Sequence, residues 1–227
     1  MSGRGLVLGL LVPAALVAAG LAATPLLAPP ALAADCMALS DFSKDTPGSF
    51  PSGWRAQKDE AKTVYRVVEE DGTRFLRATA RGTAAHAAIE REWDLKEYPV
   101  LAWRWRPRTF PEGSYERNGR SNDSALGVYV GFPRAAMAVR SLKYVWSRAV
   151  PVGTRASASA GYTRMLVLRS GATPKGWVEE RVRIPEDYGK LFDAEPGKPR
   201  GIGILTDADD TKSTAEGDYA DFRLCRS

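Results

Sequence analysis

The chain has 227 residues, a formal net charge of +5 and a single histidine. Its 32 basic and 27 acidic side chains are interspersed, and no run of lysine or arginine could follow a phosphate backbone, so nucleic-acid binding is not expected. The single histidine, His86, argues against zinc catalysis and against any Ser-His-Asp triad that does not include it.

The N-terminal segment has the parts of a secretory signal peptide. Arg4 precedes a long apolar stretch that ends in Ala-Leu-Ala at positions 31–33, an order typical of cleaved signals. The alternative is an uncleaved membrane anchor, because the apolar run approaches the roughly 20 residues that span a bilayer. Prolines and a glycine interrupt the run, so we predict removal of residues 1–33. A periplasmic or secreted domain without membrane insertion would then occupy residues 36–227.

Two cysteines lie near the two ends of this domain. Cys36 is close to the predicted cleavage site, and Cys225 is two residues from the C-terminus. In an oxidising compartment such a pair usually forms a disulfide. We therefore predict a Cys36–Cys225 bond that closes nearly the whole domain into one loop.

Between the cysteines, short apolar and aromatic runs alternate with turn-rich stretches. Many short strands with Gly and Pro turns are typical of an all-β sandwich or jelly roll. Only 186–192 and 133–140 are candidates for short helices. The expected strands are 64–68, 75–78, 87–90, 100–106, 126–132, 143–146, 164–169, 177–184, 201–205 and 219–225.

Alternation along the strands predicts which side chains face the core, because alternate residues of a strand share a face. In the run 101–106, Trp103 and Trp105 form a bulky apolar face. Arg104 and Arg106 therefore point to the opposite face.

Two further runs, 126–132 and 201–207, also have one bulky face and one face of small residues. Tyr129 lies among the small residues of the first run. Glycine weakens a strand interior and often marks the close approach of another group. That group is either a ligand or a covering loop or helix, and the sequence leaves both open. The glycines concerned are Gly127, Gly131, Gly201 and Gly203.

Four side chains are candidates for ligand contacts. Guanidinium groups bind carboxylates and phosphates bidentately, so Arg104 and Arg106 favour an anionic ligand such as a uronate or a phosphorylated glycan. Tyr129 offers an aromatic plane with a hydroxyl group, and Trp146 is the best candidate for a sugar-stacking tryptophan. The alternative for each tryptophan is packing in the core.

An acidic loop near the C-terminus suggests a metal hypothesis. Asp207 and Asp209, followed by Asp218 and Asp221, supply hard oxygen ligands of the kind that suit a structural Ca²⁺. An EF-hand is excluded, since Lys212 stands where that loop needs glycine. The alternative is a solvated turn whose aspartates accept backbone N–H bonds and pair with arginines.

Several motifs, in their order and spacing, resemble the exported bacterial family of unknown function numbered 3047. The resemblance covers nearly the whole domain, implies a galactose-binding-like β-sandwich, and brings no assigned activity. The motifs are Phe42, Pro51-x-Gly53-Trp54, Tyr98-Pro99-x-Leu101-x-Trp103-Arg104-Trp105, Tyr129-Val130-x-Phe132, Tyr144-Val145-Trp146-Ser147, Asp187-Tyr188, Thr206-Asp207-x-Asp209-Asp210-Thr211 and Tyr219-x-Asp221-Phe222.

Three functions are consistent with these features. The first is an exported, non-catalytic binding domain for an anionic glycan or another envelope component. The second is a jelly-roll polysaccharide hydrolase or lyase. A hydrolase would use paired carboxylates, whereas in a lyase His86 or Tyr129 would act as base and Arg104 or Arg106 would neutralise a uronate. The third is a structural envelope protein that binds no small ligand.

Overall fold

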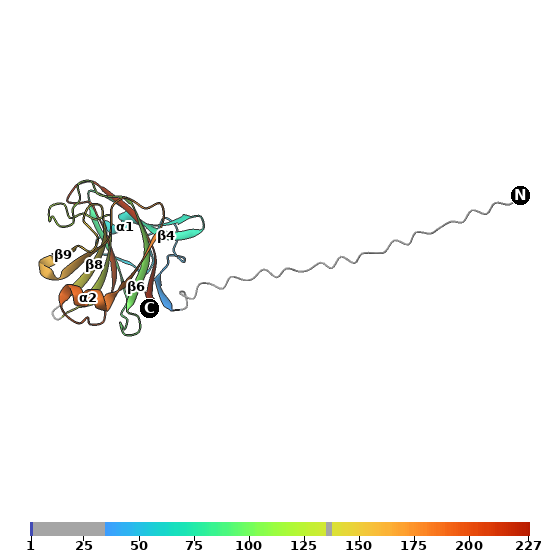
Figure 1. The fold of residues 1–227 in the computed structure, drawn as a ribbon. Coiled ribbons are helices and arrows are strands. Elements are labelled where there is room, and N and C mark those ends of the chain that lie inside the picture. The colour runs from blue at the N-terminus through green and yellow to red at the C-terminus, as the bar shows by residue number, and fades with distance from the viewer. Residues whose placement is uncertain (2–34, 135–137) are drawn as a thin grey trace. The chain divides into compact units, whose positions relative to one another are not determined.

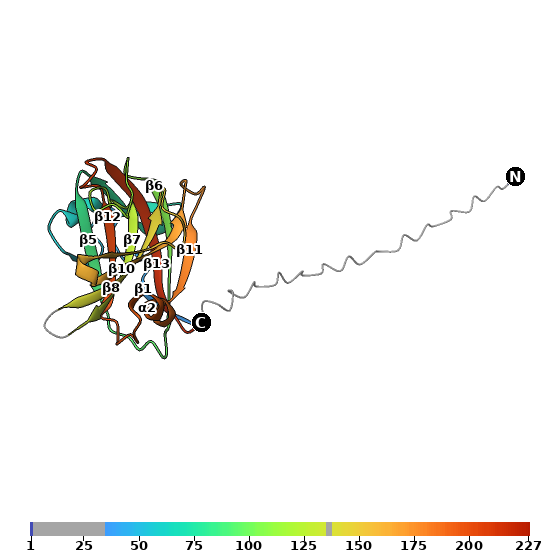
Figure 2. The same cartoon turned by 60° about the vertical axis from the view of Figure 1, so that its left-hand side comes forward.

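The computed structural model describes residues 35–134 and 138–227, together with Met1. The predicted signal peptide therefore lies outside the described residues. The described chain forms two facing β-sheets with a few short helices (Figures 1 and 2). This confirms the predicted all-β sandwich. No helix in this part of the chain is long and apolar enough to cross a membrane.

The first sheet, sheet A, has the strand order β11-β6-β13-β4-β3, and β1 pairs with β13 off this path. All of its pairs are antiparallel. Its strands are β1 (Cys36–Ser40), β3 (Tyr65–Glu70), β4 (Thr73–Arg81), β6 (Val100–Thr109), β11 (Val178–Arg183) and β13 (Thr214–Cys225).

The second sheet, sheet B, has the order β2-β5-β12-β7-β8-β10-β9, and only the β8–β10 pair is parallel. Figure 2 shows β5, β12 and β7 side by side. Its strands are β2 (Arg55–Ala56), β5 (Ala84–Glu90), β7 (Leu126–Pro133), β8 (Val139–Ser147), β9 (Arg155–Ala158), β10 (Thr163–Ser170) and β12 (Gly201–Asp207).

Aromatic side chains from both sheets fill the space between the layers. Trp103 and Trp105 of β6 are fully buried, as their alternation predicts. Trp105 contacts Trp146 of β8 at 5.7 Å between ring centroids, and Trp103 contacts Tyr144 at 5.8 Å. Because these rings come from different sheets, they join the two layers into one core.

The helix predicted at 186–192 is confirmed as α2 (Ile184–Phe192). Pro185 and two acidic residues occupy its first turn, which suits the start of a helix. Tyr188 anchors it, since its ring lies 4.6 Å from that of Phe132. The other helices are α1 (Ala61–Val64) and the 3₁₀ turn η3 (Ser159–Gly161).

The helix predicted at 133–140 is wrong. Pro133 belongs to β7, Val139 belongs to β8, and the Arg134 N–H donates to the Ala138 carbonyl. Residues 135–137 lie outside the described residues. The prediction fails at both ends of the stretch, because Pro133 pairs with Val139 and Phe132 with Arg140 in the antiparallel β7–β8 ladder.

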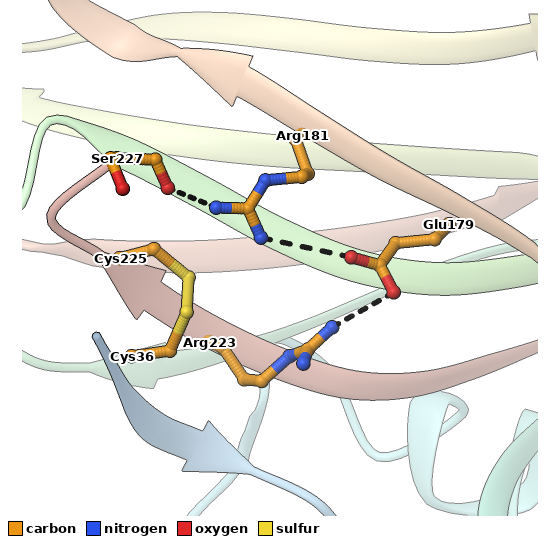
Figure 3. The surroundings of a disulfide bond; sticks show 6 residues. All are labelled: Cys36, Glu179, Arg181, Arg223, Cys225 and Ser227. Carbon is orange, nitrogen blue, oxygen red and sulfur yellow. Dashed lines mark hydrogen bonds and ion pairs between the residues drawn. A yellow bond between two sulfur atoms is a disulfide. The ribbon is translucent and has the colours of Figure 1, made fainter. Parts of the chain in front are cut away.

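The predicted disulfide is present between Cys36 and Cys225, which face each other in the β1–β13 register (Figure 3). Beside it, Arg223 and Arg181 both pair with Glu179 of β11, and Arg181 also donates to the Ser227 carbonyl. The bond thus attaches β1 to the last strand of the domain.

Candidate functional site

Arg106 lies on the outer face of sheet A, where it shares a buried carboxylate. Asp218 of β13 is fully buried and accepts hydrogen bonds from Arg77 Nε at 2.9 Å and from Arg106 Nε and Arg108 Nε at 2.7 Å. Glu70 pairs with the same three arginines at 2.8 to 3.6 Å. Two carboxylates thus hold three guanidinium groups on this face.

Aromatic rings complete this outer face. The Arg106 guanidinium carbon lies 4.4 Å from the Trp177 ring centroid and 5.0 Å from that of Phe75. Arg104 also contacts Trp177, at 5.3 Å, and pairs with Asp221 at 2.5 Å. Arg104 and Arg106 are therefore already engaged by acids and rings of the same sheet, as in a structural cluster.

Tyr129 does not lie on this face. It belongs to β7 of sheet B, and Val128 and Val130 beside it point into the core. Arg104 and Arg106 therefore do not share a face with Tyr129, because β6 pairs with β11 and β13 rather than with β7.

Trp146 points into the core. It is 5 % exposed and its ring packs against Trp105. Trp146 is therefore a packing residue of the core, and neither face of its ring is open to a sugar.

The outer face of sheet B brings Tyr129 together with two residues of neighbouring strands. The ring of His86 on β5 lies 5.8 Å from that of Tyr129. The Lys143 ammonium on β8 lies 5.7 Å from the Tyr129 ring centroid. His86 and Tyr129 are partly exposed, whereas Lys143 is only 8 % exposed. We call Tyr129, His86 and Lys143 the sheet B triplet.

Gly127 provides the space for the lysine side chain. A Cβ at this position would lie 3.4 Å from Lys143 Cε and 3.7 Å from Leu205. The stem of Lys143 therefore crosses the sheet directly over Gly127. The close approach that the glycine pattern predicts is made here by a side chain of the same sheet.

The groups around Lys143 have shifted acidities. Burial, with the negative charges of Asp123 and Asp209, raises the pKa of Asp207 to about 7. Burial also raises the pKa of Glu116, which accepts a 2.6 Å hydrogen bond from the Ser147 hydroxyl. The charge of Lys143 acts in the opposite direction on both carboxyls.

His86 is kept neutral at ordinary pH. Burial and the charge of Lys143 lower the pKa of His86 to about 4. A neutral imidazole both donates and accepts a hydrogen bond, and it is a weaker base than an ordinary histidine.

The four aspartates of the calcium hypothesis do not converge. Asp218 and Asp221 pair with arginines on the outer face of sheet A, as the turn-and-ion-pair alternative expects. Asp207 ends β12, and its carboxylate accepts the Asp209 N–H at 3.4 Å. Asp218 and Asp221 lie on β13 of sheet A, whereas Asp207 ends β12 of sheet B and Asp209 follows in the loop.

Asp123 organises the acidic loop instead. Its carboxylate is fully buried and accepts the backbone N–H groups of Asp210 and Thr211 and the Thr211 hydroxyl at 2.6 to 3.1 Å. Carboxylate oxygens of Asp123, Asp209 and Asp210 lie within 4.8 Å of one another. Calcium binding by Asp207 and Asp209 stays a prediction.

Sequence reasoning missed Lys143, Glu116 and Asp123. Lys143 carries one signal, since it follows the outward parity of β8 between the inward Leu142 and Tyr144. Glu116 and Asp123 come from the long loop before β7, where no periodicity indicates which side chains turn inward.

Residues 52–223 match the model of the family described as "Protein of unknown function (DUF3047)". The match covers more than half of the chain, so the chain belongs to this family. No curated protein sequence matches it significantly.

Solved structures with a similar outline have very different sequences. The Emp47p carbohydrate recognition domain is 11 % identical, with coverage of 86 % of this chain and 98 % of that chain and a TM-score of 0.45. The family 11 carbohydrate-binding module of cellulase Lic26A-Cel5E of Clostridium thermocellum is 8 % identical, with coverage of 85 % and 95 % and a TM-score of 0.40. TmCBM61, solved with β-1,4-galactotriose, is 13 % identical, with coverage of 83 % and 99 % and a TM-score of 0.37. None of the three supplies a residue role or a ligand for this chain.

Proposed function

We propose that this member of the DUF3047 family is an exported, non-catalytic binding domain for an anionic glycan, and that the sheet B triplet contacts the ligand. Export rests on the predicted signal peptide and accords with the disulfide. The binding surface proposed from the sequence is thus changed: Tyr129 remains, and Lys143 takes the place of Arg104 and Arg106.

The observation that carries the proposal is the environment of Lys143. Its side chain is 8 % exposed, but the ammonium itself is not a buried atom. Asp207 and Glu116 feel its charge, yet no carboxylate of the described residues lies within ion-pair distance of it. A lysine can bury its aliphatic stem while its charged end reaches solvent, and an ammonium without a direct ion pair can bind an anion there. A carboxylate or phosphate of a ligand would supply the missing counter-ion at the point where the lysine meets Tyr129.

The surroundings of the lysine suit a sugar. The partly exposed Tyr129 ring offers a plane for stacking, and neutral His86 offers a donor and an acceptor for hydroxyl groups. Gly131 and Gly203 lie beside Tyr129 on the same face and are partly exposed. The face is therefore flat enough for a ring to approach the tyrosine.

Calorimetric titration with galacturonate, glucose 6-phosphate and neutral galactose tests the proposal. We expect an anionic sugar to bind and galactose to bind more weakly. Lys143→Gln should weaken anion binding by about tenfold or more, as expected when a charged contact of roughly 1.5–3 kcal/mol is lost. The matched control is Lys175→Gln, which removes the same charge from an exposed loop position.

Equal binding by the Lys143→Gln and wild-type proteins would contradict the proposal. Comparing galacturonate with glucose 6-phosphate shows whether the site prefers a carboxylate or a phosphate. Failure of every anionic sugar to bind would favour a structural envelope protein.

A lyase is the second candidate, because the structure brings together His86 and Tyr129, the two bases named for it. The low pKa of His86 makes it a poor proton acceptor, which is why we place binding first. Ultraviolet absorbance of an unsaturated uronate, produced from polygalacturonate and lost in Tyr129→Phe, would replace the binding function by a lyase.

A further inference from the structure

A hollow at the edge of sheet B lies next to the sheet B triplet. It encloses about 230 Å³. The hollow and the sheet B triplet have one residue in common, because His86 also lines the hollow. The lining residues are Gln57, Lys58, Ala61, Ala84, Ala85 and His86.

Two positive charges act on His86. The charges of Lys143 and of Lys58 both oppose its protonation, and the negative charge of Asp209 favours it. Lys143 stands on β8, inside sheet B, and Lys58 lies just beyond β2, which pairs with β5 and forms one edge of the sheet. His86 thus lies between one cation over the sheet and a second cation in the hollow.

A series of contacts leads from one cation to the other. The Lys143 ammonium lies 5.7 Å from the Tyr129 ring centroid, the Tyr129 and His86 rings are 5.8 Å apart, and His86 lines the hollow together with Lys58. β5 and β8 are separated by β12 and β7, and three strand spacings of about 4.8 Å give roughly 14 Å. The register places Ala88, Gly203 and Tyr129 in one row across the strands, with Lys143 next to Tyr129. Small side chains therefore keep the sheet low beside Tyr129. This row continues to Arg55 of β2, and Gln57 and Lys58 follow at the level of His86.

We propose that the site takes a linear oligosaccharide with at least two anionic groups, one at Lys143 and a second at Lys58 in the hollow. This inference rests on the proposed function and specifies its ligand class. Gln57 and His86 offer hydrogen-bonding groups to the sugar hydroxyls between the two charges. A chain that crosses the strands gains a second ionic contact without a second loss of translational freedom.

Galacturonate and tetragalacturonate are the probes, titrated calorimetrically into the full domain. We expect the tetramer to bind at least about tenfold more tightly than the monomer, as a second linked contact provides. Lys58→Gln should remove most of this gain and leave the monomer affinity unchanged. Lys143→Gln should weaken both probes, and Lys175→Gln should weaken neither.

Lys58 is exposed, so its substitution should not affect folding, which the melting temperature of each variant checks. Equal affinity for the monomer and the tetramer would overturn the inference and leave the proposed function standing. If the Lys58→Gln variant still binds tetragalacturonate at least about tenfold more tightly than galacturonate, the inference is also overturned. If neither galacturonate nor tetragalacturonate binds the wild-type domain, both this inference and the proposed binding of uronates are contradicted.

Discussion

Asp218 shows how one residue can be important without contacting a ligand. It is fully buried on the outer face of sheet A and accepts hydrogen bonds from three arginines. Without this carboxylate, three guanidinium groups would repel one another, with only the exposed Glu70 left between them. The cluster therefore stabilises the pairing of β4, β13 and β6.

Asp218→Asn should lower the free energy of unfolding by about 3–5 kcal/mol, as expected when one partner of a buried ion pair is removed. Denaturant unfolding followed by circular dichroism measures it. The control is Asp59→Asn, which breaks the exposed pair with Lys62 and should barely change the midpoint. Similar midpoints for both variants would contradict the structural role of Asp218.

Asp207 and His86 make stability depend on pH in opposite directions. The pKa of Asp207 is raised from 3.8 to about 7, so the folded protein holds this proton more tightly than the unfolded chain. Its contribution is present at low pH and is lost as pH rises from about 4 to about 7. The pKa of His86 is lowered from 6.5 to about 4, so its contribution is present above about 6.5 and is lost as pH falls to about 4.

Thermal melts of two variants between pH 4 and pH 8 separate these contributions. Relative to the wild-type protein, Asp207→Asn should gain stability as pH rises through the window of Asp207. His86→Gln should gain stability relative to wild type as pH falls through the window of His86. Parallel melting-temperature curves for all three proteins would show that neither group titrates abnormally.

At the scale of elements, a bulge in β13 decides where its acids point. The register of β13 against β6 shifts between Ala220 and Arg223, and Asp221 has a left-handed φ of 52°. Simple alternation would put Asp218 and Asp221 on opposite faces, yet both reach arginines of the outer face. The sequence does not indicate this bulge, because Asp221 is not a glycine.

The disulfide acts at the same scale, by attaching β1 to β13. It joins residues 189 positions apart, so in the unfolded state it constrains nearly the whole domain. The double variant Cys36→Ser with Cys225→Ser should lose up to about 4–5 kcal/mol of stability. Calorimetry with and without a reductant measures the loss. A reductant-insensitive wild-type melt, together with two titratable thiols in the denatured protein, would contradict the bond.

At the scale of the whole molecule, local sequence patterns predict the fold class and the direction of side chains, but they do not predict which strands pair. The sandwich, helix α2 and the inward direction of Trp103 and Trp105 follow from alternation and composition. The division of strands between the two sheets does not, because it depends on contacts between residues far apart in the sequence. For this reason the outward direction of Arg104 and of Tyr129 within their strands can be predicted, whereas the sheet to which each strand belongs cannot.

The candidate site also depends on which strands pair. Tyr129 could be predicted as an outward residue, but its neighbours Lys143 and His86 come from β8 and β5. Only the order β5-β12-β7-β8 brings the three together. The sheet B triplet is thus a property of the assembled sheet rather than of any motif.

The most direct test of the account is to map where an anionic sugar binds. Backbone amide resonances of the ¹⁵N-labelled domain would be followed during titration with tetragalacturonate. We predict that the shifted amides cluster on β5, β12, β7 and β8, around Lys143. Shifts clustered instead on β4, β13 and β6, around Arg104 and Arg106, would contradict the account and return the binding surface to the outer face of sheet A.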